Sequence, residues 1–177
     1  MIWPDEIETG RLRLRRPTIE DAPAIFDGYA QDPAVVRHVM WRPHRSIDDT
    51  NDFLRTVLQR LQHGKEQSWG ITLKGDDRLI GMIAVRPNGF KHDIGYVLAQ
   101  PHWGRGITTE AARAVVDLSL SDPQVRRVWA VCDVENKASA RVMEKVGMTL
   151  EGVLRRWVTH PNISPDPRDA LCYSLVR

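Results

Sequence analysis

The sequence predicts an α+β fold, with residues 1–177 forming one domain around a mixed central sheet that has helices on both faces. The length of 177 residues suits one sizeable core. Two amphipathic segments of helical period come first, and a run of short strands follows. A strand–helix–strand–helix order and two closing strands complete the chain. We therefore expect antiparallel hairpins together with one right-handed, parallel β-α-β step.

The N-terminal third predicts one strand and two helices. Residues 11–16 alternate leucine and arginine, as a half-buried strand does. Apolar residues then recur at helical spacing over 19–29, and Pro33 is expected to end that run. A second amphipathic helix is expected to start near Ser46 and to stop at Gly64. The segment between the two helices, HVMWRPHR, is aromatic and irregular.

The remainder predicts a meander, two further helices and a hairpin. SWGITL, RLIGMIAVRP and DIGYVL are expected as consecutive antiparallel strands. A helix follows to about Leu120, and RRVWAVCDV is typical of a buried strand. Asn136 is expected to open a short helix that Gly147 stops. The last two strands are MTLEGVLRRWV and DALCYSLV, and the proline-rich loop HPNISPDP between them is expected at the surface.

Composition points away from several protein classes. The formal net charge of +2 gives no argument for nucleic acid or for an anionic membrane surface. No apolar run approaches the roughly 18 residues of a membrane span, and the acidic N-terminus has no signal-peptide core. Cys132 and Cys172 lie far apart, and the six histidines show no ligand spacing. We expect a cytoplasmic protein with two buried, reduced thiols and no metal.

Four arginines near the N-terminus raise nucleic-acid binding as an alternative function. Arg11, Arg13, Arg15 and Arg16 lie within one predicted strand. Acidic residues precede and follow them, and alternating charge of this kind is more typical of a solvated outer face. We therefore expect no nucleic-acid partner.

The stretch HWGRGITTEA places two glycines directly before a predicted helix. Gly104 and Gly106 let the main chain turn so that the first N–H groups of the helix converge, and no Cβ blocks an approaching anion. A phosphate or pyrophosphate suits that position, and Arg105 adds positive charge. The alternative is that the glycines only make a tight turn. Neither a P-loop nor a dinucleotide fingerprint is present.

A second motif, NKASARVMEKVGMTLEG, begins at Asn136. Together with WGRGITTEA it resembles the GCN5-related N-acetyltransferases (GNAT), most closely the branch that contains the ribosomal-protein N-terminal acetyltransferases. TGRLRLRRPTIEDA, HDIGYVL and RDALCYSLV also resemble that branch, so the likeness covers nearly the whole chain in order. It implies direct transfer of the acetyl group of acetyl-CoA to a primary amine. The acceptor would be a protein or peptide N-terminal α-amine or a small-molecule amine.

The resemblance also implies a set of residues that bind acetyl-CoA. They are Tyr96, Val97 and Leu98 in a strand that splays, the loop residues Trp103, Gly104, Arg105, Gly106, Ile107, Thr108 and Thr109, and Asn136 and Ser139 at the start of the next helix. The chain departs from the family pattern in the loop, where Trp103 replaces a glutamine or arginine and Thr108 replaces a glycine or alanine.

The same resemblance suggests catalytic roles. Ser139 is expected near the cofactor sulfur, where it would donate a proton to the departing thiolate. Many relatives use a tyrosine as this general acid, and Met143 stands at that position here. Asp93 leads a strand beside the expected cleft and is the candidate base and acceptor contact. Trp41 is expected in the wall of the acceptor site. The simpler readings are a helix cap for Ser139 and a plain strand-end residue for Asp93.

Two questions stay open at the level of the sequence. A domain that binds and senses an acyl-CoA without turnover is the alternative to an enzyme, because the tyrosine acid is missing. The chain is expected as a monomer or a homodimer.

Overall fold

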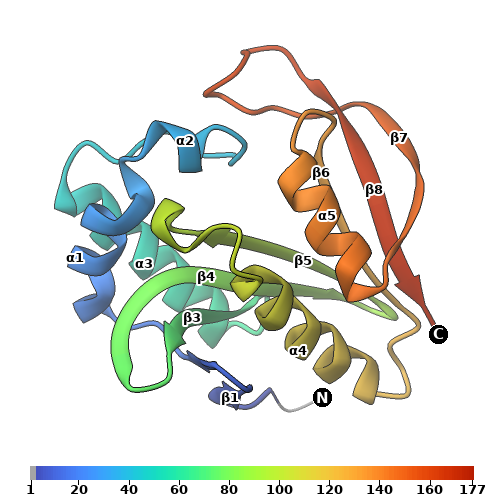
Figure 1. The fold of residues 1–177 in the computed structure, drawn as a ribbon, viewed down its shortest axis with the longest axis horizontal. Helices are drawn as coiled ribbons and strands as arrows, with labels where there is room; N and C mark the ends of the chain where they lie inside the picture. Colours follow the sequence, from blue (N-terminus) through green and yellow to red (C-terminus); the bar gives the residue numbers. More distant parts are fainter. Residues whose placement is uncertain (1–2) are drawn as a thin grey trace.

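The computed structural model describes residues 3–177 and contains an eight-stranded mixed sheet in the order β1-β2-β3-β4-β5-β6-β8-β7 (Figure 1). The strands are β1 (Glu6–Glu8), β2 (Leu12–Arg15), β3 (Gln67–Leu73), β4 (Asp76–Asn88), β5 (Lys91–Leu98), β6 (Arg127–Asp133), β7 (Thr149–Val158) and β8 (Arg168–Val176). Every neighbouring pair is antiparallel except β5 and β6, which run parallel. The predicted α+β fold is confirmed.

Helices cover both faces of the sheet. They are α1 (Ala22–Ile25), α2 (Pro33–Val36) and α3 (Ile47–Gln62) from the N-terminal third, and α4 (Ile107–Ser121) and α5 (Lys137–Val146) from the C-terminal half. In Figure 1, α4 and α5 lie in front of the sheet and α3 lies behind it. The caps follow the sequence signals: Ser46 and Asp49 form a capping box at α3, and the side chain of Asn136 accepts from the backbone N–H of Ser139 at α5.

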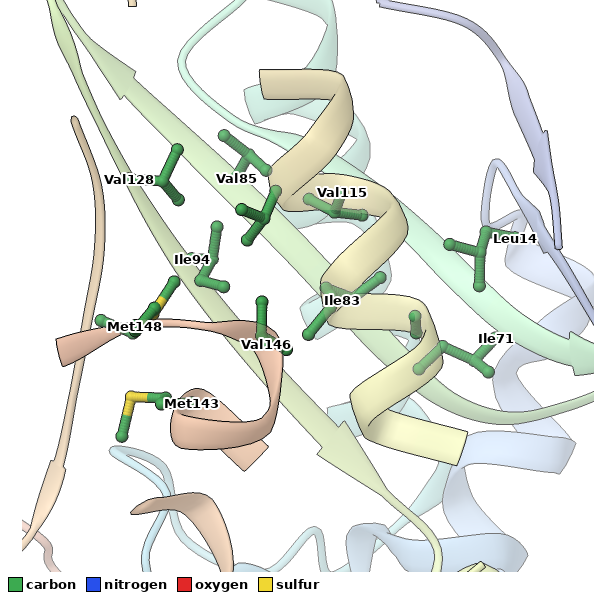
Figure 2. Close-up of a cluster of buried hydrophobic side chains, with 14 of the residues drawn as sticks. Leu14, Ile71, Ile83, Val85, Ile94, Val115, Val128, Met143, Val146 and Met148 are labelled. Carbon is green, nitrogen blue, oxygen red and sulfur yellow. The ribbon is translucent and has the colours of Figure 1, made fainter. Parts of the chain in front are cut away.

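Two clusters of buried apolar side chains hold these layers together. The larger lies between the sheet and the pair α4 and α5, and Figure 2 shows Ile83 and Ile94 of the sheet against Val115 and Met143 of the helices. The smaller lies on the other face, between the sheet, α1 and α3. A side chain of β5 or β6 that joins one cluster therefore has chain neighbours that point to the opposite face.

The sheet splits between β5 and β6. Only three residue pairs join these strands, and the last of them is Asp93 with Trp129. Beyond that pair the two strands diverge (Figure 1), whereas β5 stays paired with β4 as far as Leu98. The main-chain groups of β5 that point toward the split therefore have no strand to bind. This is the splayed strand that the resemblance implies.

Three expectations about the N-terminal segments were wrong or incomplete. The first helix is not regular: it begins as a 3-10 turn at Ile19–Asp21, continues as α1 and ends as a π-helical segment at Phe26–Ala30. Pro33 does more than end that run, because it is the first residue of α2, where its missing N–H costs nothing. The short strand β1 was not predicted.

The loop between β7 and β8 is not a plain surface loop, contrary to expectation. His160, near its start, is buried. The amide of Asn162 donates to the carbonyl oxygens of Val36 and Trp41 at 2.6 and 2.7 Å. These two hydrogen bonds tie the loop to the connection between α2 and α3.

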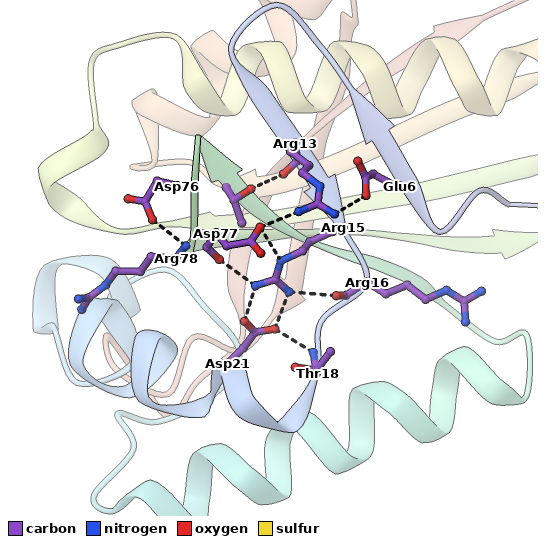
Figure 3. Close-up of polar contacts among 10 residues, drawn as sticks. Glu6, Arg13, Arg15, Arg16, Thr18, Asp21, Asp76, Asp77 and Arg78 are labelled. Carbon is purple, nitrogen blue, oxygen red and sulfur yellow. Dashed lines mark hydrogen bonds and ion pairs between the residues drawn. The ribbon is translucent and has the colours of Figure 1, made fainter. Parts of the chain in front are cut away.

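The arginine-rich strand β2 is neutralised by carboxylates, as Figure 3 shows. Arg13 pairs with Glu6 and with Asp77, both at 2.7 Å. Arg15 binds Asp21 at 2.6 Å, and this mostly buried pair includes the acidic residue of the capping box that Asp21 forms with Thr18 in the first helical turn. Within the described chain the arginines therefore have carboxylate partners. The predicted solvated face holds for Arg13 and Arg16, whereas Arg15 is mostly buried.

Further findings bear on the composition. Cys132 and Cys172 are free and buried. Within residues 3–177 no helix is long and apolar enough to cross a membrane, and no group of three or more histidine, cysteine or acidic side chains is arranged to hold a metal.

Candidate active site

The glycine loop ends in a left-handed turn at the N-terminus of α4. Gly104 has a φ of 73° and Gly106 a φ of 75°, a region that residues with a Cβ rarely adopt. Gly106 is the N-cap of α4, and its carbonyl accepts the first intrahelical bond, from the N–H of Glu110. The N–H groups of Ile107, Thr108 and Thr109 have no intrahelical acceptor and are available to an anion.

A cavity of about 440 Å³ lies beside this turn. Its lining comes from the β1–β2 turn, α4 and α5, and consists of Thr9, Gly106, Thr109, Glu110, Arg113, Ala114, Asp117 and Lys145. The guanidinium of Arg113 donates to the carbonyl oxygen of Lys145. Two cations and the two carboxylates of Glu110 and Asp117 thus line the cavity beside the helix N-terminus. The guanidinium of Arg113 and the ammonium of Lys145 suit a ligand that carries several phosphates.

Arg113 and Lys145 were not among the predicted site residues. A signal for Arg113 was present, because it lies four residues after Thr109 and so shares its face of the helix. Lys145 comes from α5, 32 positions further along, and only the fold brings it to the cavity.

The loop is held in place by contacts to the β1–β2 turn. Glu110 accepts from the Thr9 hydroxyl at 2.6 Å and from the backbone N–H of Arg11 at 2.8 Å. Arg11 also donates to the Arg105 carbonyl at 3.0 Å. Burial opposes ionisation of Glu110, but these hydrogen bonds outweigh it and lower the pKa of the carboxyl. Glu110 is therefore a structural anchor of the loop.

Trp103 connects the loop to the end of β5. Its indole N–H donates to the carbonyl oxygen of Leu98 at 2.7 Å, while about 46% of the residue remains exposed. The bond occupies one polar group at the open edge of the strand. It also fixes the distance between the split sheet and the glycine turn.

Ser139 and Tyr96 meet across the split. The two hydroxyl oxygens lie 2.9 Å apart, and the Tyr96 hydroxyl is also 3.2 Å from the carbonyl oxygen of Ser139. Burial raises the pKa of Tyr96, so this phenol stays protonated. Met143 stands where many relatives keep a tyrosine, and it is buried in the core without a polar role. In this chain the tyrosine hydroxyl that reaches Ser139 is that of Tyr96 on β5.

Burial also sets the state of the neighbouring thiol on β6. It raises the pKa of Cys132 to about 11, against a smaller lowering by a hydrogen bond with Ser139. A thiol of this kind is protonated at neutral pH and is a poor nucleophile. This agrees with direct transfer, in which no covalent enzyme intermediate forms.

Asp93 lies at the closed end of the split and on the opposite face of β5 from Tyr96. Its carboxylate accepts from Nε of Arg86 at 2.6 Å, and Arg86 also faces the buried Glu66 at 3.8 Å. Burial raises the pKa of Asp93, Arg86 lowers it, and Glu66 adds to the rise, with a net upward shift. The structure therefore does not bring the two predicted catalytic residues, Asp93 and Ser139, onto one face.

Trp41, which the resemblance suggests for the acceptor wall, lies in the connection between α2 and α3. Its ring packs against His44 at 5.0 Å and Phe53 at 6.4 Å between ring centroids. Its carbonyl is one of the two oxygens that Asn162 binds. Trp41 thus lies where the connection between α2 and α3 meets the loop between β7 and β8, and its place in an acceptor wall stays a prediction.

Comparison with known proteins identifies the family. The model of the acetyltransferase (GNAT) domain matches residues 11–149. The chain belongs to the GNAT family. It is 33% identical over 174 residues to the uncharacterized N-acetyltransferase YoaA of Bacillus subtilis (strain 168), covering 97% of this chain and 96% of that one. This GNAT protein is an acetyl-CoA-dependent acetyltransferase, which sets aside the reading of a non-catalytic sensing domain.

Two further proteins are similar to this chain, one in sequence and one in fold. The ribosomal-protein-serine acetyltransferase of Escherichia coli (strain K12) is 33% identical over 115 residues, which is 63% of each chain. The crystal structure of the microcin C7 self-immunity acetyltransferase MccE, in complex with acetyl-CoA and AMP, shares the fold with a TM-score of 0.88. It covers 99% of this chain and 98% of its own, at 23% identity.

Proposed function

We propose that this enzyme acetylates a primary amine, either the N-terminal α-amine of a peptide or protein or a small-molecule amine. The single observation that carries the proposal is the split of β5 from β6 directly beside the glycine turn, with the Tyr96–Ser139 hydroxyl pair at its edge. The name of the Escherichia coli relative, a ribosomal-protein-serine acetyltransferase, supports a protein as the acceptor.

The residues present fit acetyl-CoA, which supplies an activated thioester. The turn at Gly104 and Gly106 with the first N–H groups of α4 would hold the pyrophosphate, and Arg113 and Lys145 would hold further phosphate charge. The open edge of β5 from Tyr96 onward would pair with the amide-bearing arm, as the resemblance implies. The N–H of Leu98, which points away from β4, would polarise the thioester carbonyl, whereas the main chain of Val97 faces β4.

Acetyl transfer exchanges a carbon–sulfur bond for a carbon–nitrogen bond, and it needs a proton donor for the thiolate and a proton acceptor for the amine. A bond forms between the amine nitrogen and the acetyl carbon, and the carbon–sulfur bond breaks. Ser139 donates its hydroxyl proton to the departing thiolate, and Tyr96 keeps the Ser139 hydroxyl oriented. The amine gives up a proton on the other side. A role for Asp93 as its acceptor stays a prediction, because its carboxylate is already engaged by Arg86.

The acceptor class follows from the cost of freeing the amine. At pH 7, deprotonating a lysine of pKa about 10.4 costs about 4.6 kcal/mol, whereas an α-amine of pKa about 7.8 costs only about 1 kcal/mol. On the face of β5 opposite Tyr96, the described chain offers no unpaired carboxylate near Asp93. Glu66, the neighbouring carboxylate, faces the same guanidinium of Arg86 that binds Asp93. An amine of modest pKa therefore suits this site better than an ordinary lysine.

A pair of matched peptides tests the proposal. One carries a free α-amine and blocked lysines, and its twin carries a blocked N-terminus and one free lysine. We expect faster acetylation of the first peptide at pH 7, measured by mass spectrometry and by release of the CoA thiol, with a smaller difference at pH 9. Faster acetylation of the lysine twin at pH 7 would refute the α-amine assignment.

A further inference from the structure

A buried carboxylate ends β6 on the face of the sheet opposite α4 and α5, where Trp41 packs against the smaller cluster. Ala130 and Cys132 belong to the core under α4 and α5, so the next side chain, Asp133, points to the opposite face. Its carboxylate is fully buried. It accepts from Nε and Nη2 of Arg168 at 2.6 and 3.2 Å and from the backbone N–H of Glu135 at 2.9 Å.

An imidazole faces this carboxylate without a full hydrogen bond. The side chain of His160 is 6% exposed, and its Nε2 lies 3.9 Å from Oδ2 of Asp133. Within residues 3–177, Nε2 has no hydrogen-bond partner, and Nδ1 is 3.4 Å from the carbonyl oxygen of Val39. A buried nitrogen without a partner is costly, so its retention points to a use.

A second imidazole extends the pair toward solvent. The ring of His38 stands edge-on to His160, with centroids 6.1 Å apart and an angle of 87°. His38 is half-buried, and its buried Nδ1 also has no partner in the described chain. It precedes Trp41 by three positions, within the segment that Asn162 ties to the loop of His160.

We propose that His38 is the catalytic base that takes the proton from the acceptor amine, with His160 and Asp133 as positioning residues behind it. The proposal rests on the proposed transfer to an amine. In the step, the ammonium group of the acceptor loses one proton to a ring nitrogen of His38. The freed nitrogen lone pair then forms the new bond to the acetyl carbon as the carbon–sulfur bond breaks, and Ser139 protonates the departing thiolate. The second proton that the nitrogen loses restores the Ser139 hydroxyl, and His38 passes its own proton to water.

The charges around His38 suit a base that is neutral before the reaction. Burial lowers the pKa of His38, and Arg37 and His160 lower it further, while Asp133 and Glu135 raise it. Arg168 neutralises part of both carboxylates, at 2.6 Å from Asp133 and 3.2 Å from Glu135. The imidazole is thus uncharged at neutral pH, and the carboxylate behind His160 stabilises the imidazolium once it forms.

The test is the pH profile of kcat and kcat/KM for the α-amine peptide, measured for the wild type, His38→Gln, Asp93→Asn and the control His63→Gln. His63 lies at the exposed end of α3 and bonds only to the Gln59 carbonyl in the described chain. We expect His38→Gln to lower kcat/KM at pH 7 by about 100-fold, the scale of one positioned base. Its acidic limb should move up toward the amine's own pKa of about 7.8.

Two controls accompany this test. Calorimetry should give all variants the wild-type affinity for acetyl-CoA, and His63→Gln should keep the wild-type profile. The proposal is overturned if His38→Gln keeps the wild-type profile, or if Asp93→Asn removes the acidic limb in its place. A wild type that acetylates no amine would instead remove the proposed function.

His160→Gln provides a second arm, and it is judged only after its thermal unfolding matches that of the wild type. If His160 positions His38, the acidic limb of the pH profile should shift in His160→Gln. The kcat of His160→Gln should fall less than that of His38→Gln. If His160→Gln is folded and identical to the wild type in both respects, the positioning role is wrong.

Discussion

Replacing Gly106 by alanine separates the turn's conformation from its role in binding. The φ of 75° at Gly106 costs a residue with a Cβ about 1–2 kcal/mol. The added Cβ would meet only Nη2 of Arg11, at an ordinary contact distance of 3.6 Å, so strain is the main effect on stability. For a chain of this size we expect the unfolding temperature to fall by about 2–8 °C.

The effect on binding should be larger than the effect on folding. The methyl group would stand beside the first N–H groups of α4, and losing one hydrogen bond to a charged group costs about 2–3 kcal/mol. The Kd for CoA should therefore rise about 30- to 150-fold, measured by calorimetric titration of the folded variant.

Gly75→Ala is the matched control for Gly106→Ala. Gly75 has a φ of 86° in the turn between β3 and β4, and no atom lies within 4 Å of a Cβ placed there. It should lose the same stability and keep the wild-type Kd. If Gly106→Ala binds CoA as tightly as Gly75→Ala does, the turn is not the phosphate site and the reasoning from its geometry fails.

Three further predictions follow from single side chains. Ser139→Ala should lower kcat by about 10- to 100-fold while the KM for acetyl-CoA changes little, and an unchanged kcat would leave Ser139 with a structural role only. Tyr29→Phe should raise the free energy of unfolding in urea by about 1 kcal/mol, because the buried hydroxyl has no partner within residues 3–177; a loss of stability contradicts this. Hydrogen bonds from Arg127 and then from the Ser174 hydroxyl lower the pKa of Glu151 from 4.5 to about 2. The stabilisation is therefore full above pH 4.5 and is lost as the pH falls toward 2, so Glu151→Gln should differ from the wild type at pH 6 and match it near pH 2; an equal difference at both values would count against the ion pair.

Much of the fold was predictable because its signals are local. The capping box at Ser46 and the limits of α5 at Asn136 and Gly147 depend on residues close in sequence, and the structure confirms them. The strand β1 is only three residues long and exists through its pairing with β2, so no local pattern announces it. Pro33 is compatible with the end of one helix and with the start of another, and only packing decides between the two.

The candidate site was predictable only where one motif contains it. The glycine turn is such a motif, and its conformation is as expected. The hydroxyl pair of Tyr96 and Ser139 joins residues 43 positions apart, and the contact of His160 with Asp133 brings a loop to a strand end. Neither periodicity nor spacing encodes such contacts, because they depend on how the sheet splits and which loop folds over it.

The two hydrogen bonds of Asn162 also bear on the order in which the enzyme is assembled. They close chain segments 121 and 126 residues long, whereas Trp103 reaches Leu98 across only five positions. Closing a long segment costs more chain entropy than closing a short one, and contacts of high sequence separation form slowly. The link between the glycine loop and β5 can therefore form early in folding, whereas the contacts of Glu110 with Thr9 and Arg11 span 101 and 99 positions. The acceptor wall waits for the C-terminal hairpin, and we expect it to be the last part of the site to close and the first to open in hydrogen exchange.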